Sequence, residues 1–144
     1  GANTVEVCLV DPNMEPAGSE VIQAVQALID PNKNGDGSGE APIGAVCTVT
    51  TAERLEIAVS ASVTIAEEAE LGAVTEAVKA NLTDYLREIA FAKGVSYVSY
   101  AQITSRINAT EGVLDHKDLT VNGGTSNVPL EDRQTPVLGE VHLT

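Results

Sequence analysis

At residues 55–65 the chain reads Leu55-Glu56-Ile57-Ala58-Val59-Ser60-Ala61-Ser62-Val63-Thr64-Ile65. Every odd-numbered residue in this stretch is apolar, whereas the even-numbered ones are Glu, Ala, Ser and Thr. Because side chains alternate between the two faces of a β-strand, the pattern predicts a strand with one buried face. Its other face meets water or a partner. We expect this strand to be central to the fold.

A long amphipathic helix is predicted after the strand, from Leu71 to about Ala92. Its apolar residues recur every three or four positions, which is typical of a helix with one buried face; they are Leu71, Val74, Val78, Leu82, Tyr85, Leu86 and Ile89. We expect this face to pack against the odd-numbered residues of the strand. A shorter helix is predicted over Tyr100–Asn108, with Ile103 and Ile107 directed inward.

The region before the central strand predicts one helix between two strands. Thr4–Val10 and Val46–Thr50 have the composition of strands. Ser19–Asp30 has helical periodicity, and Ser19 is a suitable N-cap. A polar, glycine-rich loop, Asn32–Glu40, follows the helix.

From residue 111 to 144 the sequence changes to short strands and turns. The apolar pieces and the turn between them are Val113-Leu114, Leu119-Thr120-Val121, the hairpin-type turn Asn122-Gly123-Gly124, Val128–Leu130 and Pro136–Leu143. The whole order predicts the α+β class, with a mixed sheet and helices packed on one face. Its outline is that of a split βαβ, ferredoxin-like arrangement followed by a C-terminal strand and turn region. We expect a single domain over residues 1–144, of which 111–144 is a strand-rich extension.

The composition argues against several classes of partner. The chain has 144 residues, with 8 basic and 21 acidic side chains and a formal charge of −13. An acidic surface repels the phosphates of nucleic acids and the anionic surface of membranes. No apolar run is long enough to span a membrane, and no secretory signal is recognised. Cys8 and Cys47 stand in apolar runs and are predicted to be buried free thiols.

The loop at residues 30–41 is a candidate calcium site. Its candidate oxygen ligands are Asp30, Asn32, Asn34, Asp36 and Ser38. The match to a calcium-binding helix–loop–helix fails at position 12, where a bidentate glutamate is needed, because Ala41 stands there and Glu40 is one residue early. Lys33 also brings a positive charge into the loop. The alternative interpretation is a glycine-rich crossover loop without metal.

The motifs of common enzymes are absent from the sequence. It contains no nucleophile elbow, phosphate loop or dinucleotide fingerprint. His116 and His142 are the only histidines, and neither has a partner at a zinc-ligand spacing. We therefore predict no catalytic residue and no cofactor, and expect the chain to act through its surfaces.

Five stretches carry a resemblance that covers essentially the whole chain. They are Gly1–Val7, Val21–Pro31, Gly39–Ala45, Gly112–Asp115 with Leu119–Gly124, and Asn127–Val128 with Pro136–Val141. In order and spacing they resemble the C-terminal part of the baseplate J-like protein family of contractile-tailed phages and prophages. The most specific stretch is Gly39–Ala45.

The resemblance implies a structural wedge component of a tail baseplate, assembled in the bacterial cytoplasm and then part of the virion tail. Other baseplate and tail proteins, or further copies of the chain, are the implied partners. The chain is expected to be a C-terminal fragment of a longer protein. We expect its contacts at two loops, Asn32–Glu40 and Asn122–Asn127, because functional contacts concentrate on loops held by a rigid scaffold. The alternative function is a ligand- or calcium-binding module that uses the loop at residues 30–40.

Overall fold

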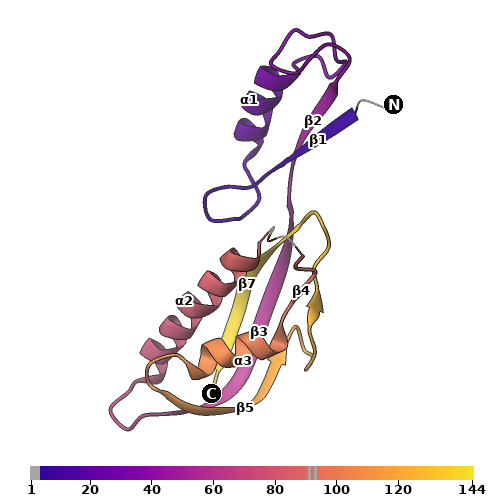
Figure 1. Cartoon of the computed structure of the whole chain (residues 1–144). Coiled ribbons are helices and arrows are strands. Elements are labelled where there is room, and N and C mark those ends of the chain that lie inside the picture. The colour runs from indigo at the N-terminus through magenta and orange to yellow at the C-terminus, as the bar shows by residue number, and fades with distance from the viewer. Residues whose placement is uncertain (1–3, 91, 93) are drawn as a thin grey trace. The chain divides into compact units, whose positions relative to one another are not determined.

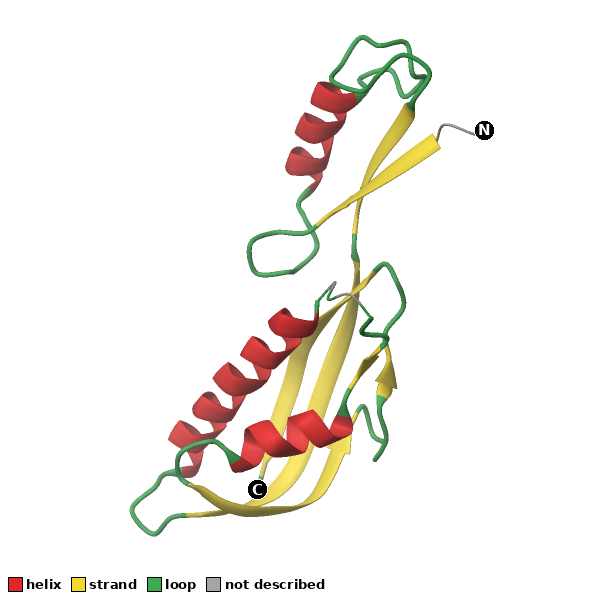
Figure 2. Ribbon diagram, viewed as in Figure 1, coloured by secondary structure: helices red, strands yellow, loops and turns green. Residues whose placement is uncertain are grey.

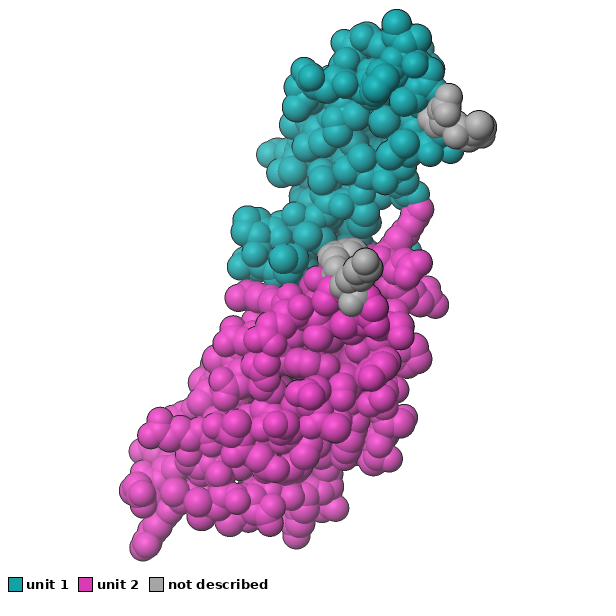
Figure 3. Space-filling model, in the orientation of Figure 1, with its two compact units in different colours: residues 1–53 teal, residues 54–144 magenta. Residues whose placement is uncertain are grey.

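The computed structural model of the chain describes residues 4–90, 92 and 94–144. The elements follow in the order β1 (Thr4–Leu9), α1 (Ser19–Ile29), β2 (Val46–Thr51), β3 (Glu53–Ile65), α2 (Leu71–Ile89), β4 (Tyr97–Val98), α3 (Tyr100–Asn108), β5 (Val113–Val121), β6 (Val128–Pro129) and β7 (Gln134–Leu143) (Figures 1 and 2). The predicted α+β class is confirmed. A single domain was expected, and the structure groups the residues into two compact units, Gly1–Glu53 and Arg54–Thr144 (Figure 3).

The second unit is built on a three-stranded sheet in the order β5-β3-β7, with β3 in the centre. β3 pairs with β5 in antiparallel fashion, with Val59 opposite Val121. On the other side, Thr144 donates its N–H to the carbonyl of Ala61 (3.1 Å) and accepts from the N–H of Val63 (2.9 Å). One residue bonded to two alternate residues of its neighbour is the parallel pattern, so the sheet is mixed.

Helices α2 and α3 cover one face of this sheet (Figure 2). The buried side chains of β3 are Ile57, Val59 and Ala61, and they share one core with α2 residues Val74, Val78, Leu82 and Leu86. Ile103 and Ile107 of α3 are fully buried in the same core. The predicted inward faces of all three elements are confirmed, except that Leu71, the first residue of α2, is exposed (39%). None of the helices in the described part of the chain is long and apolar enough to cross a membrane.

The C-terminal strands differ in detail from the prediction. β5 is one strand, although its middle, Asp115–Asp118, is charged; Asp118 has a positive φ of 55°, and the register with β3 shifts nearby. The two-stranded ladder of β4 and β6 was only half predicted, because two residues of β4 are too few for a periodic signal. α2 ends at Ile89 and not at Ala92, and the intervening Phe91 lies outside the described residues.

The predicted turn after β5 is confirmed by its backbone. Asn122 and Gly123 both have positive φ, 50° and 76°. Val121 and Gly124 exchange both backbone hydrogen bonds around them, at 2.8 and 3.0 Å. These are the features of a tight two-residue turn, which glycine and asparagine accommodate at little steric cost.

The first unit contains β1, α1 and β2. The two strands pair in parallel, with Val5 opposite Cys47 and Val7 opposite Val49, and α1 packs on β2. These strands form a sheet of their own. Ser19 is the first helical residue and not the predicted N-cap; Gly18 holds that position, and no side chain caps the helix there.

The first unit has a small core. Its buried apolar residues are Ala17, Cys47, Val49 and Ala52. Cys47 is buried as predicted, but the prediction for Cys8 is wrong, because that side chain is exposed. Cys8 is paired with Thr50 on the sheet face opposite to the one that carries Val49. Large apolar side chains remain exposed as well: Val5, Val21, Leu28 and Ile43.

Candidate functional site

The loop after α1 begins with a buried carboxylate. Asp30 is 2% exposed and occupies the C-cap position of α1. Its Oδ2 accepts hydrogen bonds from the backbone N–H groups of Gly35 (3.2 Å) and Cys47 (3.1 Å). The carboxylate therefore joins the end of the helix to the loop and to β2. This structural role uses an oxygen that a metal ion would need.

The other predicted ligands form a local hydrogen-bond network. The amide Nδ2 of Asn32 donates to Asp36 Oδ2 (2.7 Å) and to Ser38 Oγ (3.3 Å). Asn34 Oδ1 accepts from the backbone of Asp36, and Asp36 Oδ1 accepts from the backbone of Ser38. The structure thus brings four of the five candidates into one network, with Asp30 bonded separately. Among the described residues, no group of three or more His, Cys, Asp or Glu could hold a metal ion.

We predict that calcium does not stabilise the protein. Asn32 presents N–H donors to Asp36 and Ser38, where an ion would need oxygens, and Asp30 is bonded to two backbone amides. A melting curve recorded with chelator should match one recorded with excess calcium. A ligand at a hundredfold excess over its Kd would add about 2.7 kcal/mol to the unfolding free energy. A rise of several degrees with calcium, absent with magnesium and abolished by Asp36→Ala, would refute this prediction.

The network also lowers the pKa of one exposed carboxyl, that of Asp36. Hydrogen bonds from the side chain of Ser38, then from Asn32 and from the backbone of Ser38, lower the pKa of Asp36 from 3.8 to about 2. Each of these bonds favours the charged form. The associated stabilisation is present above pH 3.8 and disappears as the pH falls through about 2.

An NMR titration of the Asp36 carboxyl should therefore give a midpoint of about 2. Ser38→Ala removes the largest contribution and should move the midpoint upward, toward the ordinary value. A wild-type midpoint of 3.8 would show that the loop network does not persist in solution.

The end of this loop caps α1 with backbone groups. The N–H of Glu40 donates to Leu28 O, and the N–H of Ala41 donates to Ile29 O, both at 2.9 Å. A Cβ on Gly39 would lie 2.4 Å from Ile29 O, so only glycine permits this approach. The last carbonyls of a helix lack partners within the helix, and the loop supplies them. The residues Gly39, Glu40 and Ala41 of the stretch Gly39–Ala45 are therefore explained by their contacts with the end of α1.

Sequence reasoning missed the role of Gln26. This side chain is 8% exposed, the most buried polar group of α1. Its Nε2 donates to Asp30 O (2.6 Å) and Cys47 O (2.9 Å), and its Oε1 accepts from Val49 N (2.8 Å). The amide pairs with the β2 edge that faces away from β1, as a neighbouring strand would. The signal in the sequence was a glutamine on the inward face, beside Ile22 and Val25.

The second predicted contact loop is also tied to the fold. Asn122 Oδ1 accepts from the N–H of Ala58 (2.7 Å), and its Nδ2 donates to Glu56 O (3.1 Å). Asn127 Oδ1 accepts from the N–H of Tyr100, at the start of α3. Thr125 and Ser126 between them are exposed. Of this loop, the exposed tip is the part that remains available for contacts.

The two histidines lie in different surroundings. His116 Nδ1 is 2.7 Å from Asn108 Oδ1. His142 lines a shallow pocket on the sheet face opposite the helices, together with Ser60, Thr120 and Glu140.

Comparison with known proteins identifies the family to which the second unit belongs. A family model described as the baseplate J-like protein C-terminal domain matches residues 57–144. The chain belongs to the baseplate J-like protein family. The matched range begins within β3, three residues after the boundary at which the second compact unit starts. The unit with the large common core is therefore the C-terminal domain of this family.

Similarity to curated proteins extends over both units. The chain is 32% identical over 143 residues to the phage-like element PBSX protein XkdT of Bacillus subtilis (strain 168). It is likewise 32% identical over 143 residues to the uncharacterized protein YqbT of the same strain. In each case the alignment covers 99% of this chain and 40% of the relative. The chain thus spans about two fifths of the length of the relatives that it matches.

Proposed function

We propose that this chain is a structural module of a phage-like tail baseplate, a part of the wedge that works by binding neighbouring proteins. The observation that carries the proposal is the baseplate J-like match, which coincides with one complete compact unit. The similarity to a protein of a phage-like element supports the same context. Assembly in the bacterial cytoplasm and a final position in the virion tail follow from this role.

Contacts, and not catalysis, are the proposed means of action. The residues predicted as ligands are engaged in hydrogen bonds that hold the loop at residues 30–41. The strong acidity of the chain, −13 in total, favours partners with basic surfaces. Many modest contacts in an assembled baseplate act together, because each one raises the effective concentration of the next.

Inactivation of the gene in its lysogen tests the proposed role. Electron microscopy of the induced culture should show that complete tails are missing, and a plasmid copy of the gene should restore them. Complete, functional tails in the inactivated strain would refute the proposal. Release of cell-wall fragments by the purified chain would refute the non-catalytic part separately.

A further inference from the structure

The outward face of α1 is apolar. Val21, Ala24 and Leu28 stand at positions i, i+3 and i+7, which places them on one side of the helix. Val21 is 53% exposed, Leu28 is 60% exposed, and Ala24 between them is exposed as well. We call this set the α1 stripe.

The inward face of the same helix is also mostly apolar, because Ile22, Val25 and Ile29 are half-buried on the side of the helix that carries the buried Gln26. Only one of the 11 residues of α1 is charged, Glu20. A helix that is apolar all round is normally buried on all sides. α2 is a contrast within the chain, because four of its eight exposed positions carry charges: Glu76, Asp84, Arg87 and Glu88. The α1 stripe is therefore composed like a surface that another molecule covers.

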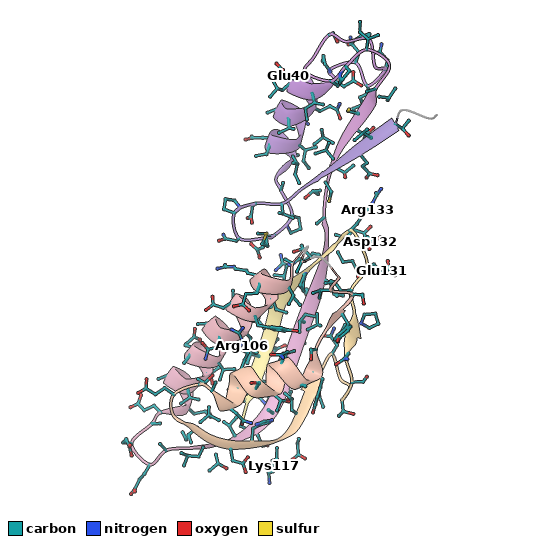
Figure 4. All side chains as sticks on the ribbon, viewed as in Figure 1. Glu40, Arg106, Lys117, Glu131, Asp132 and Arg133 are labelled. Atoms are coloured by element: carbon teal, nitrogen blue, oxygen red, sulfur yellow. The ribbon has the colours of Figure 1, made fainter. Side chains whose placement is uncertain are left out.

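Acidic side chains stand at both ends of the stripe. Glu20 lies in the first turn of α1. Glu40 is exposed and lies beside the last turn, since its N–H donates to Leu28 O (Figure 4). Over residues 1–53 the chain has a single cation, Lys33, against eight carboxylates, which gives a formal charge of −7.

A second copy of this chain fits the stripe poorly. Two α1 helices in antiparallel contact would set Glu20 of each copy near Glu40 of the other, and parallel contact would set each carboxylate near its own equivalent. Both arrangements bring like charges together. The helix is also only about 16 Å long, so such a contact would fall below the roughly 1,200 Å² that a stable interface buries.

We propose that the α1 stripe docks a segment of another baseplate or tail protein, with an apolar centre and a Lys or Arg at each end. This inference rests on the proposed function and specifies the binding surface. The apolar centre would bury Val21 and Leu28 around Ala24. The basic ends would meet Glu20 and Glu40, which selects against further copies of the chain.

A competition experiment in the lysogen tests the proposal. A tagged variant is expressed beside the untagged wild-type chain, so that particles form in every case, and mass spectrometry compares the variant-to-wild-type ratio in purified particles with the ratio in the cell. Val21→Ser/Leu28→Ser and, separately, Glu20→Lys/Glu40→Lys should each lower the relative incorporation about tenfold or more. Leu114→Ser, a change at an exposed leucine of β5, should incorporate like wild type.

The outcomes distinguish a failure of the proposed function from a failure of the docking proposal. Absence of wild-type chain from the particles would refute the proposed function. Presence of wild type with normal incorporation of either double variant would refute the docking proposal alone, provided that melting curves show each variant to be folded. A photo-crosslinker at Ala24 should link to a peptide of a different protein with basic residues on both sides of an apolar centre. A link to a second copy of the chain, or to no other protein, would overturn the proposal.

Discussion

Gln26→Leu is expected to unfold the β1–α1–β2 unit while the sheet of β5, β3 and β7 keeps its structure. The substitution retains the bulk of the side chain but removes three hydrogen bonds. It leaves Cys47 O and Val49 N without their buried partner, whereas Asp30 O keeps the N–H of Lys33 (3.1 Å). An unsatisfied buried polar group costs roughly 1–3 kcal/mol, so the loss from these two groups should be about 2 kcal/mol or more.

The free energy of unfolding of the first unit is expected to be small compared with such a loss. Its buried apolar side chains are small, and a two-stranded sheet with one helix is marginal alone. Hydrogen exchange measured by mass spectrometry should show lost protection at Val46–Thr51 and retained protection at Ile57–Val63. Gln23→Leu, at an exposed position of the same helix, is the matched control and should retain protection in both segments. Native protection of β2 in Gln26→Leu would show that the amide network is dispensable.

The second large effect is expected at Ile57. Its side chain is fully buried and lies with Leu82, Leu86 and Ile103 around the centre of the core. Ile57→Ala removes three carbon atoms from a site that the sheet and two helices hold rigidly. Such truncations cost about 2–5 kcal/mol, partly through lost burial and partly through the cavity that remains.

Urea unfolding, followed by the circular dichroism of the helices, measures this loss. Thr64→Ala changes an exposed residue of the same strand and should cost much less. A loss below about half a kcal/mol for Ile57→Ala, with the slope of the transition unchanged, would contradict the assignment of this face to the core.

Periodic patterns predicted the parts of the fold in which burial decides the structure. The strict alternation at residues 55–65 and the apolar stripe of α2 each predicted one buried face, and both faces are confirmed apart from Leu71, which is exposed. The sequence predicted two separate pieces in place of β5, because the middle of this strand is charged. An edge strand with an irregular register tolerates Asp115 and Lys117 on its surfaces. Cys8 was wrongly predicted to be buried. The single helix α1 covers only one face of the two-stranded sheet, and Cys8 lies on the other face.

The polar contacts were harder to predict than the elements. The spacing of Asp30, Asn32 and Asn34 suggested oxygens directed at an ion, whereas in the structure these groups bond the backbone or one another. The spacing of residues shows which side chains are close along the chain. It does not show which backbone N–H groups need a hydrogen-bond acceptor in the folded protein. The same limit explains Gln26, because two of its three bonds reach the β2 edge, 21 and 23 residues away. The outward apolar face of α1 could not be predicted, because periodicity alone does not show which apolar side chains of a helix are exposed.

The position of the chain in the particle tests the central claim most directly. A short epitope inserted between Thr125 and Ser126, which are exposed, can be labelled with antibody and gold on intact particles. A baseplate module should place the gold at the distal end of the tail in electron micrographs. Gold on the capsid or along the tail tube would contradict a baseplate role.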